Sequence, residues 1–363
     1  MLTLLEEPQL LRVHKNLKQQ EKMRINPHKP TIKDIARDLN VSVSTVSRAL
    51  RGMPDVNPQT MKDILRHAEK IDYQPNMAAL SLVKKQTQTI GIIVPNMDYF
   101  FATAIRGIDE AALEAGYTVM ICQSNESYGR EVVNTKRLML SSVDGLIVSL
   151  SSETNNVDHF RRVIQKDIPI VFFDRTSTDL NASGVVLDNA HGAEQAVTHL
   201  IEQGCTRIAL LGSHEHMSIS SLRENGYREA LKKEGLTIDD SLIFHCDFDQ
   251  ESAYRATVQL LGKRNPPDAI FAVSDRMALG AFLAVKEKGL RIPEDVAIVG
   301  FNDEPIMSLL TPKLSSVAQP AFEMGRRAAR LFIEHIHAEV KTDVETIVLK
   351  PQLMIRESSL KKQ

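Results

Sequence analysis

The sequence predicts a small all-α domain followed by two α/β units in tandem. Two short helical patterns, each with its own start signal, lie back to back within residues 31–50. From Thr89 onward, apolar strand-like runs alternate with amphipathic helical stretches, which is typical of a parallel, doubly wound sheet. The same alternation restarts with the run RIALLGS at residues 207–213, so we expect a second sheet of the same kind.

The first helical pattern has both a start and a stop signal. Thr31 can cap the helix together with Asp34 in its first turn, as in a capping box, and Asn40 ends the helix. After a tight turn, Ser42 can cap a second helix. The apolar side chains that we expect to face the core are Ile32, Ile35, Ala36 and Leu39 in the first helix and Val46, Ala49 and Leu50 in the second. This arrangement indicates a helix-turn-helix, which places its second helix in the major groove of DNA.

A third helix follows the pair. Asn57 is its predicted cap, Pro58 occupies the first helical position, and the pattern runs to about Ile71. Three short helices of this kind form one small domain. The outward side chains of the second helix, which would read the DNA, are Val43, Ser44, Ser47 and Arg48.

The composition is that of a soluble globular protein with an uneven charge distribution. The chain has 363 residues, 43% hydrophobic and 25% charged, with a formal net charge of −2. Residues 1–88 carry 15 Lys and Arg against 9 Asp and Glu, whereas residues 89–363 carry 29 against 37. The basic excess coincides with the paired helices, as a phosphate-facing module requires, although such an excess is also common on solvated surfaces.

Four sequence segments carry a family resemblance. TIKDIA, VSVSTVSRAL, DYQP and the ALSL that follows resemble the LacI/GalR family of bacterial transcription regulators, over about Thr31 to Ser359. The resemblance implies a helix-turn-helix head joined to a two-lobe effector domain of the periplasmic-binding-protein-like (type I) fold. It also implies a sequence-specific DNA-binding regulator, most simply a repressor of carbohydrate-use genes under allosteric control by a small sugar-like effector. The ligand would lie at the carboxyl ends of the strands.

The same resemblance suggests how the chain divides. We expect an N-terminal extension at 1–28, disordered, a DNA-binding domain at 29–73, a hinge helix and linker at 74–88, and an effector-binding and dimerisation domain at 89–363. Lobe 1 would comprise residues 89–188 and 320–342, and lobe 2 residues 189–319 and 343–358, with crossings near Asp188, Gln319 and Lys341. Met23 lies nearer the family's usual start, so residues 1–22 are either a mis-assigned beginning or a disordered arm.

The segment from Gln74 to Leu82 reads as a very short helix. Helices of this length are marginal in water, so it should fray unless something packs on it. In the family this hinge helix pairs with its dimer mate in the minor groove and inserts a leucine that Leu82 matches, whereas Leu80 departs from the family's usual polar residue. An ordinary linker helix is the alternative. The residues that we expect to contact DNA are Thr31, Lys33, Ser42, Val43, Ser44, Thr45, Ser47, Arg48, Asn57, Ala79 and Leu82.

Polar side chains at strand ends are the candidates for an effector cleft, because there they can point at a ligand while the strand stays buried. For some of them a turn or helix-capping role is the alternative. By resemblance, Arg223 would hold a hydroxyl or carboxylate of the effector, unless it forms a surface salt bridge, and Asn302 stands where many relatives have Asp. The candidate effector-binding residues are Phe100, Phe101, Ser149, Asp174, Arg175, Arg223, Phe248, Ser274, Asp275 and Asn302, of which the phenylalanines could stack on a ligand or belong to the core.

Other chemistries find little support in the sequence. Cys122, Cys205 and Cys246 lack metal-ligand spacing and read as reduced core thiols in a cytoplasm, and His214-Glu215-His216 reads as a solvated loop rather than a metal pair. We expect no metal, no cofactor and no membrane partner, because the chain shows no apolar run of membrane length, no signal peptide, no calcium loop and no phosphate-binding or nucleophile motif.

A cytoplasmic homodimer on an operator in double-stranded DNA is the economical expectation, since the sequence shows no terminal apolar heptads. A solute-binding receptor without a regulatory role and an enzyme acting in the cleft are the rival interpretations, although no base and nucleophile pair is evident. The identity of the effector, the operator and target genes, repression versus activation, and induction versus corepression stay open.

Overall fold

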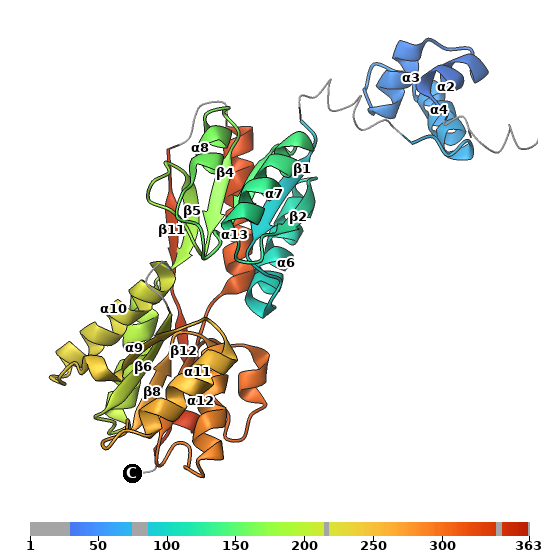
Figure 1. Ribbon diagram of the computed structural model, residues 1–363. Helices are drawn as coiled ribbons and strands as arrows, with labels where there is room; N and C mark the ends of the chain where they lie inside the picture. The colour runs from blue at the N-terminus through green and yellow to red at the C-terminus, as the bar shows by residue number, and fades with distance from the viewer. Residues whose placement is uncertain (1–29, 75–85, 214–217, 339–342, 362–363) are drawn as a thin grey trace, which may run out of the picture. The chain divides into compact units, whose positions relative to one another are not determined.

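A computed structural model describes residues 30–74, 86–213, 218–338 and 343–361 (Figure 1). The expected N-terminal extension and most of the expected hinge, including Ala79 and Leu82, lie outside the described residues. The chain separates into two compact units, Met1–Lys85 and Gln86–Gln363, which are described separately below.

In its described residues, 30–74, the N-terminal unit has three short helices, α2 (Ile32–Asp38), α3 (Val43–Leu50) and α4 (Pro58–Lys70). All three predicted caps are confirmed. The backbone N–H of Thr31 donates to the Asp34 carboxylate at 2.9 Å, and the Ser42 hydroxyl accepts from the backbone N–H of Thr45 at 3.0 Å. The Asn57 side chain accepts from the backbone N–H of Gln59 at 2.9 Å.

The core of this unit is small. Ile35, Val46 and Ile64, one from each helix, are fully buried, and Ala36, Ala49, Val56 and Ala68 complete the cluster. Burying each large aliphatic side chain contributes about 1.5 to 3 kcal/mol, so the three together stabilise the helices that are too short to persist alone. Leu50 is only half-buried at the edge of this cluster.

The first lobe of the larger unit is built on a six-stranded sheet in the order β11-β5-β4-β3-β1-β2. Its strands are β1 (Thr89–Val94), β2 (Thr118–Gln123), β3 (Gly145–Val148), β4 (Ile170–Phe173), β5 (Ser183–Leu187) and β11 (Thr346–Leu349). Its helices are α6 (Tyr99–Glu114), α7 (Tyr128–Leu140), α8 (Asp158–Ile164) and α13 (Ala321–His337). Adjacent residues on a strand face opposite layers: Ile92 packs in the cluster with α6 and α13, whereas Ile93 packs in the one with α7 and α8.

Helices α6 and α13 approach so closely that their contact needs glycine. A Cβ added at Gly107 would lie 2.0 Å from the backbone oxygen of Phe322, and one at Gly325 would lie 1.9 Å from that of Ala104. These two helices therefore form one rigid layer, from which the N-terminal end of α6 reaches the site described below.

The second lobe repeats the plan with the strand order β12-β10-β9-β8-β6-β7. Its strands are β6 (Ile208–Ser213), β7 (Ile243–Cys246), β8 (Ala269–Ala272), β9 (Ala297–Asn302), β10 (Ser315–Ala318) and β12 (Gln352–Met354). Its α-helices are α9 (Asn189–Glu202), α10 (Ser218–Lys233), α11 (Gln250–Leu261) and α12 (Asp275–Glu287), with short 3₁₀ helices at Asp240–Leu242, Pro305–Ser308 and Glu357–Ser359. Only β12 runs antiparallel to its neighbour.

The chain passes between the lobes after β5, after β10 and after β11 (Figure 1). The first two passages lie near Asp188 and Gln319, but the prediction of a third near Lys341 was wrong. β11 pairs in parallel with β5, from Thr346 opposite Gly184 to Leu349 opposite Leu187, so residues 346–349 belong to lobe 1. The passage follows at Lys350 and Pro351. The error arose because one apolar run supplies the edge strands of two different sheets, and only the pairing partners show where it divides.

Two further features of the described residues bear on function. None of the described helices is long and apolar enough to traverse a bilayer. The three cysteines are free thiols, with Cys205 buried and Cys122 and Cys246 half-buried at the edges of the core.

Candidate functional site

The outer face of α3 is the candidate DNA-binding surface. Val43, Ser44 and Arg48 are exposed, and Thr45 and Ser47 are half-exposed beside them. Thr31, Lys33, Ser42 and Asn57 are also exposed, although the oxygens of Ser42 and Asn57 already cap helices. The surface thus presents hydroxyls, methyl groups, an ammonium and a guanidinium, which are the groups that read base edges and phosphates.

Arg48 has a partner that DNA could replace. Its Nη1 lies 3.2 Å from Asp55 Oδ2, and the two side chains are 44% and 55% exposed. Such an exposed pair contributes about 0 to 1 kcal/mol because water and salt screen it. The guanidinium can therefore exchange this carboxylate for a base or a phosphate at little cost.

A cavity of about 310 Å³ lies between the two lobes of the larger unit, in the size range of small-ligand sites. Its wall comes from the segments that follow strands of both sheets, so the carboxyl ends of the strands face it. The lining residues are Asn96, Asp98, Phe100, Phe101, Glu126, Ser152, Asp174, Arg175, Ile219, Arg223, Phe248, Asp249, Ser274, Arg276, Asn302, Glu304 and Gln319.

Eight of the ten predicted effector residues line this cavity, and the other two, Ser149 and Asp275, do not. Phe100, Phe101, Asp174, Arg175, Arg223, Phe248, Ser274 and Asn302 line the cavity. Ser149 does not line it; its side chain is fully buried, and its hydroxyl has no hydrogen-bond partner among the described residues. Asp275 does not either: its two carboxylate oxygens accept from the Ser316 hydroxyl and the Glu304 backbone N–H, each at 2.6 Å, and burial raises its pKa to about 7.

Arg223 is a buried cation, so its alternative role as a surface salt bridge is wrong. Only 1% of the residue is exposed. Its Nε donates to Asn189 Oδ1 at 2.8 Å and its Nη1 to the Val273 carbonyl at 2.6 Å, while its guanidinium stacks 3.6 Å from the centre of the Phe301 ring. Burial lowers the pKa of Arg223 to about 9, with Asp174 opposing that shift. The side chain is therefore held in place before any ligand arrives.

On the first lobe, Arg175 contacts Glu126, Leu150 and Asp174. Its Nη1 donates to Glu126 Oε2 at 2.7 Å and to the Leu150 carbonyl at 3.4 Å, and its Nε lies 3.8 Å from Asp174 Oδ2. Burial alone would raise the pKa of Glu126, but the charge and hydrogen bond of Arg175, together with hydrogen bonds from Ser152, outweigh it, and the pKa lies below its ordinary value. Burial is dominant for Asp174, whose pKa is raised.

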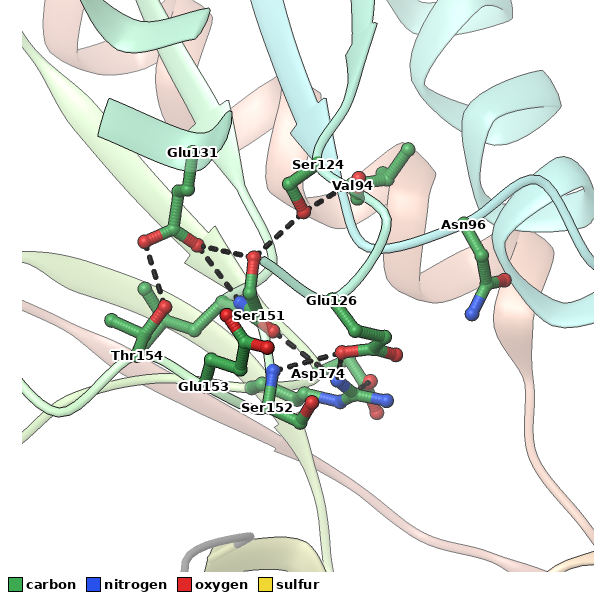
Figure 2. Close-up of polar contacts among 12 residues, drawn as sticks. Val94, Asn96, Ser124, Glu126, Glu131, Ser151, Ser152, Glu153, Thr154 and Asp174 are labelled. Atoms are coloured by element: carbon green, nitrogen blue, oxygen red, sulfur yellow. Dashed lines mark hydrogen bonds and ion pairs between the residues drawn. The ribbon is translucent and has the colours of Figure 1, made fainter. Parts of the chain in front are cut away.

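Glu131 holds the loop behind this wall (Figure 2). Its carboxylate is fully buried and accepts from the backbone N–H of Ser151 at 2.8 Å, the Ser151 hydroxyl at 3.0 Å and the Thr154 hydroxyl at 2.8 Å. The Nε2 of His159 lies 3.0 Å from Glu131 Oε1, the oxygen that also accepts from Thr154. Since Ser152, between these anchors, lines the cavity, Glu131 positions part of the wall without touching the cavity itself.

On the second lobe, Asn302 and Gln319 are joined to each other. Gln319 Nε2 donates to Asn302 Oδ1 at 2.6 Å, and both residues line the cavity. Ser274 both lines the cavity and accepts from the Met277 backbone N–H at 3.3 Å, so its capping and lining roles coexist. Phe100 and Phe101 meet edge to face with ring centres 5.1 Å apart and belong mainly to the core, with part of each ring on the cavity.

One ion pair joins the two lobes directly. Arg276 Nη2 lies 2.5 Å from Asp98 Oδ2, and both residues line the cavity. Sequence reasoning missed Arg276, Asp98, Glu126, Glu304 and Gln319 among others. A signal was available for Arg276, because a basic residue in the first turn of a helix opposes the helix dipole and therefore suggests a carboxylate or a ligand nearby.

A helix-turn-helix unit in one chain with a two-lobe ligand cavity defines a class, the ligand-responsive DNA-binding proteins. Residues 31–76 match the model of the bacterial regulatory proteins of the lacI family, and residues 197–359 match that of the periplasmic binding protein-like domain.

Relatives match along nearly the whole chain. Catabolite control protein A of Priestia megaterium is 31% identical over 331 residues, covering 91% of this chain and 99% of that protein. The probable HTH-type transcriptional repressor ExuR of Bacillus subtilis is 33% identical and covers 90% of this chain and 98% of its own length. The solved complex of the transcriptional regulator CelR with cellobiose is 31% identical, with a TM-score of 0.70, covering 91% of this chain and 99% of that one. The chain belongs to the LacI family of bacterial transcription regulators.

Proposed function

We propose that this regulator is a repressor of carbohydrate-use genes, and that the cavity between its lobes binds a small sugar-like effector. The main support for this proposal is the cavity, where polar side chains from both lobes lie beside phenylalanine rings. Similarity to a regulator solved with cellobiose and to a probable repressor supports the proposal.

The ten candidate effector residues contribute unequally to this proposal. Asp174, Arg175, Arg223, Phe248, Ser274 and Asn302 are proposed as contacts, with Phe100 and Phe101 as an apolar floor. Ser149 and Asp275 are not proposed as contacts, since both are buried and neither lines the cavity.

Control of DNA binding would come from differential affinity. A ligand that touches both lobes binds one lobe arrangement better than another, and this difference sets the largest shift that it can cause. The Asp98–Arg276 pair joins the same two lobes, so it would strengthen or weaken together with ligand contacts. We propose a cytoplasmic homodimer that presents two helix-turn-helix heads to a palindromic operator.

Binding without turnover fits the cavity better than catalysis does. Among the residues that the structure describes, its lining includes carboxylates, guanidiniums, amides and two serines, without a histidine or a cysteine. The Ser274 hydroxyl already accepts a backbone hydrogen bond. A solute receptor without a regulatory role is disfavoured, because it would have no use for the DNA-binding unit.

The test couples both sites in one protein. Full-length protein would be screened by thermal shift against sugars and nucleosides, and each ligand that raises the melting temperature would be titrated into the protein bound to its operator. We expect a sugar to stabilise the protein and to change operator affinity at the same concentrations. Ligands that stabilise without changing DNA binding would instead favour the receptor interpretation, and turnover of the ligand would favour an enzyme.

A further inference from the structure

The charges that line the interlobe cavity are unbalanced. Among the described lining residues, five carboxyl groups face three guanidiniums, an excess of two potential negative charges. The carboxyl groups are those of Asp98, Glu126, Asp174, Asp249 and Glu304, and the guanidiniums are those of Arg175, Arg223 and Arg276.

Every one of the three cations already has a partner. Arg175 donates to Glu126 at 2.7 Å, and Arg276 lies 2.5 Å from Asp98. Arg223 is engaged by an amide, a carbonyl and an aromatic ring. An anionic ligand would therefore have to displace a carboxylate from Arg175 or Arg276, or approach Arg223 next to the charge of Asp174, and in each case its own charge would face the excess.

Of the five carboxyl groups, that of Asp174 has the fewest partners among the described residues. Among the described residues no hydrogen bond reaches the Asp174 side chain, which is 4% exposed; the Arg175 guanidinium lies 3.8 Å away, and the charge of Arg223 also acts on it. Burial raises the pKa of both Asp174 and Glu304 above the usual range, and the nearby Asp98 adds to the shift of Glu304. Such groups are stabilised by a ligand that donates hydrogen bonds, as hydroxyls and ammonium groups do.

We propose that the cavity selects an uncharged or cationic polyhydroxylated ligand, such as a neutral sugar or an amino sugar, and discriminates against sugar acids and sugar phosphates. This inference rests on the proposed effector function and narrows it by charge. In this proposal ligand hydroxyls donate to Asp174 and Glu304. Arg175 and Arg276 stay paired with Glu126 and Asp98 and do not bind an anion. A like charge held about 4 Å from an unpaired carboxylate near a protein surface costs several kcal/mol.

The test uses ligand sets that share one carbon skeleton. For several pentoses and hexoses, the neutral sugar, its 2-amino derivative, its uronic acid and its terminal phosphate would be titrated calorimetrically into the full-length protein. We expect the tightest binding from neutral or amino members, with the acid and the phosphate of that skeleton at least about 100-fold weaker. An acid or phosphate that binds most tightly overturns the charge inference but leaves a small-molecule effector in place. Binding by no member of any set overturns the sugar-like effector and this inference together.

A matched pair of variants makes the assignment specific. Glu126→Gln releases Arg175 from its carboxylate, so we expect it to improve binding of the uronic acid about 10-fold relative to the neutral sugar. Asp295→Asn removes a surface carboxylate that pairs with Arg291 at 2.8 Å just before the amino end of β9, at the other end of the sheet from the cavity, and should change neither. Unchanged operator affinity would verify that both variants fold. An unchanged acid-to-neutral ratio in Glu126→Gln would contradict the proposal that paired arginines exclude anions.

Discussion

The N-terminal unit and the effector unit use arginine in opposite ways. In the N-terminal unit, Arg48 and Asp55 form a pair at 3.2 Å in which both side chains are about half exposed. In the effector unit, Arg175 is 10% exposed and Glu126 35% exposed in a pair at 2.7 Å, and Arg223 is fully buried. The difference shows that a DNA-binding surface keeps a cation whose partner can be exchanged, whereas the ligand cavity keeps cations whose geometry is already set.

The strongest way to break this comparison is Arg223→Ala. Its loss would leave Asn189 and the Val273 carbonyl unpaired beside an empty stacking site on Phe301, so we expect the free energy of unfolding to fall by about 3 to 5 kcal/mol and ligand binding to disappear. Urea denaturation and calorimetry would measure both. Arg223→Lys keeps the charge without the fork of donors and should recover part of the stability but little of the binding. Full ligand affinity in Arg223→Ala would remove this residue from the site.

Glu131 provides a second, smaller test on the effector side. Glu131→Ala would leave the donors of Ser151, Thr154 and His159 without their acceptor, so we expect a loss of about 2 to 4 kcal/mol and weaker ligand binding, because the loop that carries Ser152 loosens. Glu131→Gln keeps one acceptor oxygen and should cost about half as much. The readouts are denaturation midpoints and ligand affinity. If ligand affinity stayed unchanged while stability fell, Glu131 would be a structural residue only.

Arg48→Ala sharpens the other side of the comparison. Since Arg48 lies on the outer face of α3, we expect operator affinity to fall by about 1 to 3 kcal/mol if it reads a base edge, with little change in stability. Fluorescence anisotropy with operator and random DNA would separate base reading from phosphate contact. Equal affinity of the variant and the parent for both DNAs would exclude Arg48 from the interface.

The smallest expected effect is the pH dependence contributed by Asp275. Its folded pKa of about 7 lies above its ordinary value of 3.8, so the folded state binds this proton more tightly than the unfolded state does. The resulting stability is fully present below the ordinary value and is lost as the pH rises from about 4 to about 7. We expect a loss on the order of 1 kcal/mol or more between pH 5 and pH 8, measured by urea denaturation.

The control for this prediction is Asp275→Asn. The amide keeps one acceptor, and the Ser316 hydroxyl can reverse its hydrogen bond to accept from the new amide. The variant should therefore show a flatter stability profile between pH 5 and pH 8. A profile as steep as that of the parent would assign the pH dependence to other groups.

Local signals determined much of the N-terminal unit from the sequence alone. The caps at Thr31, Ser42 and Asn57 act on backbone groups two or three residues away, so the residues that form them are adjacent in the chain and can be read there. The strand-end rule found Asp174 and Asn302 in the effector unit for a similar reason, since the end of an apolar run is visible in the sequence. The family resemblance added Arg223, which no local pattern singles out.

The tertiary structure decided which strand-end side chains reach the cavity and what they meet there. Ser149 and Asp275 end strands as Asp174 does, yet packing buries them behind the wall. Residues 346–349 join lobe 1 because β5 offers the free edge, which no property of that run encodes by itself. The Asp98–Arg276 pair joins two lobes through residues far apart in the chain. Interactions within a few residues are set by the local sequence, whereas interactions between distant segments depend on how the sheets and helices pack.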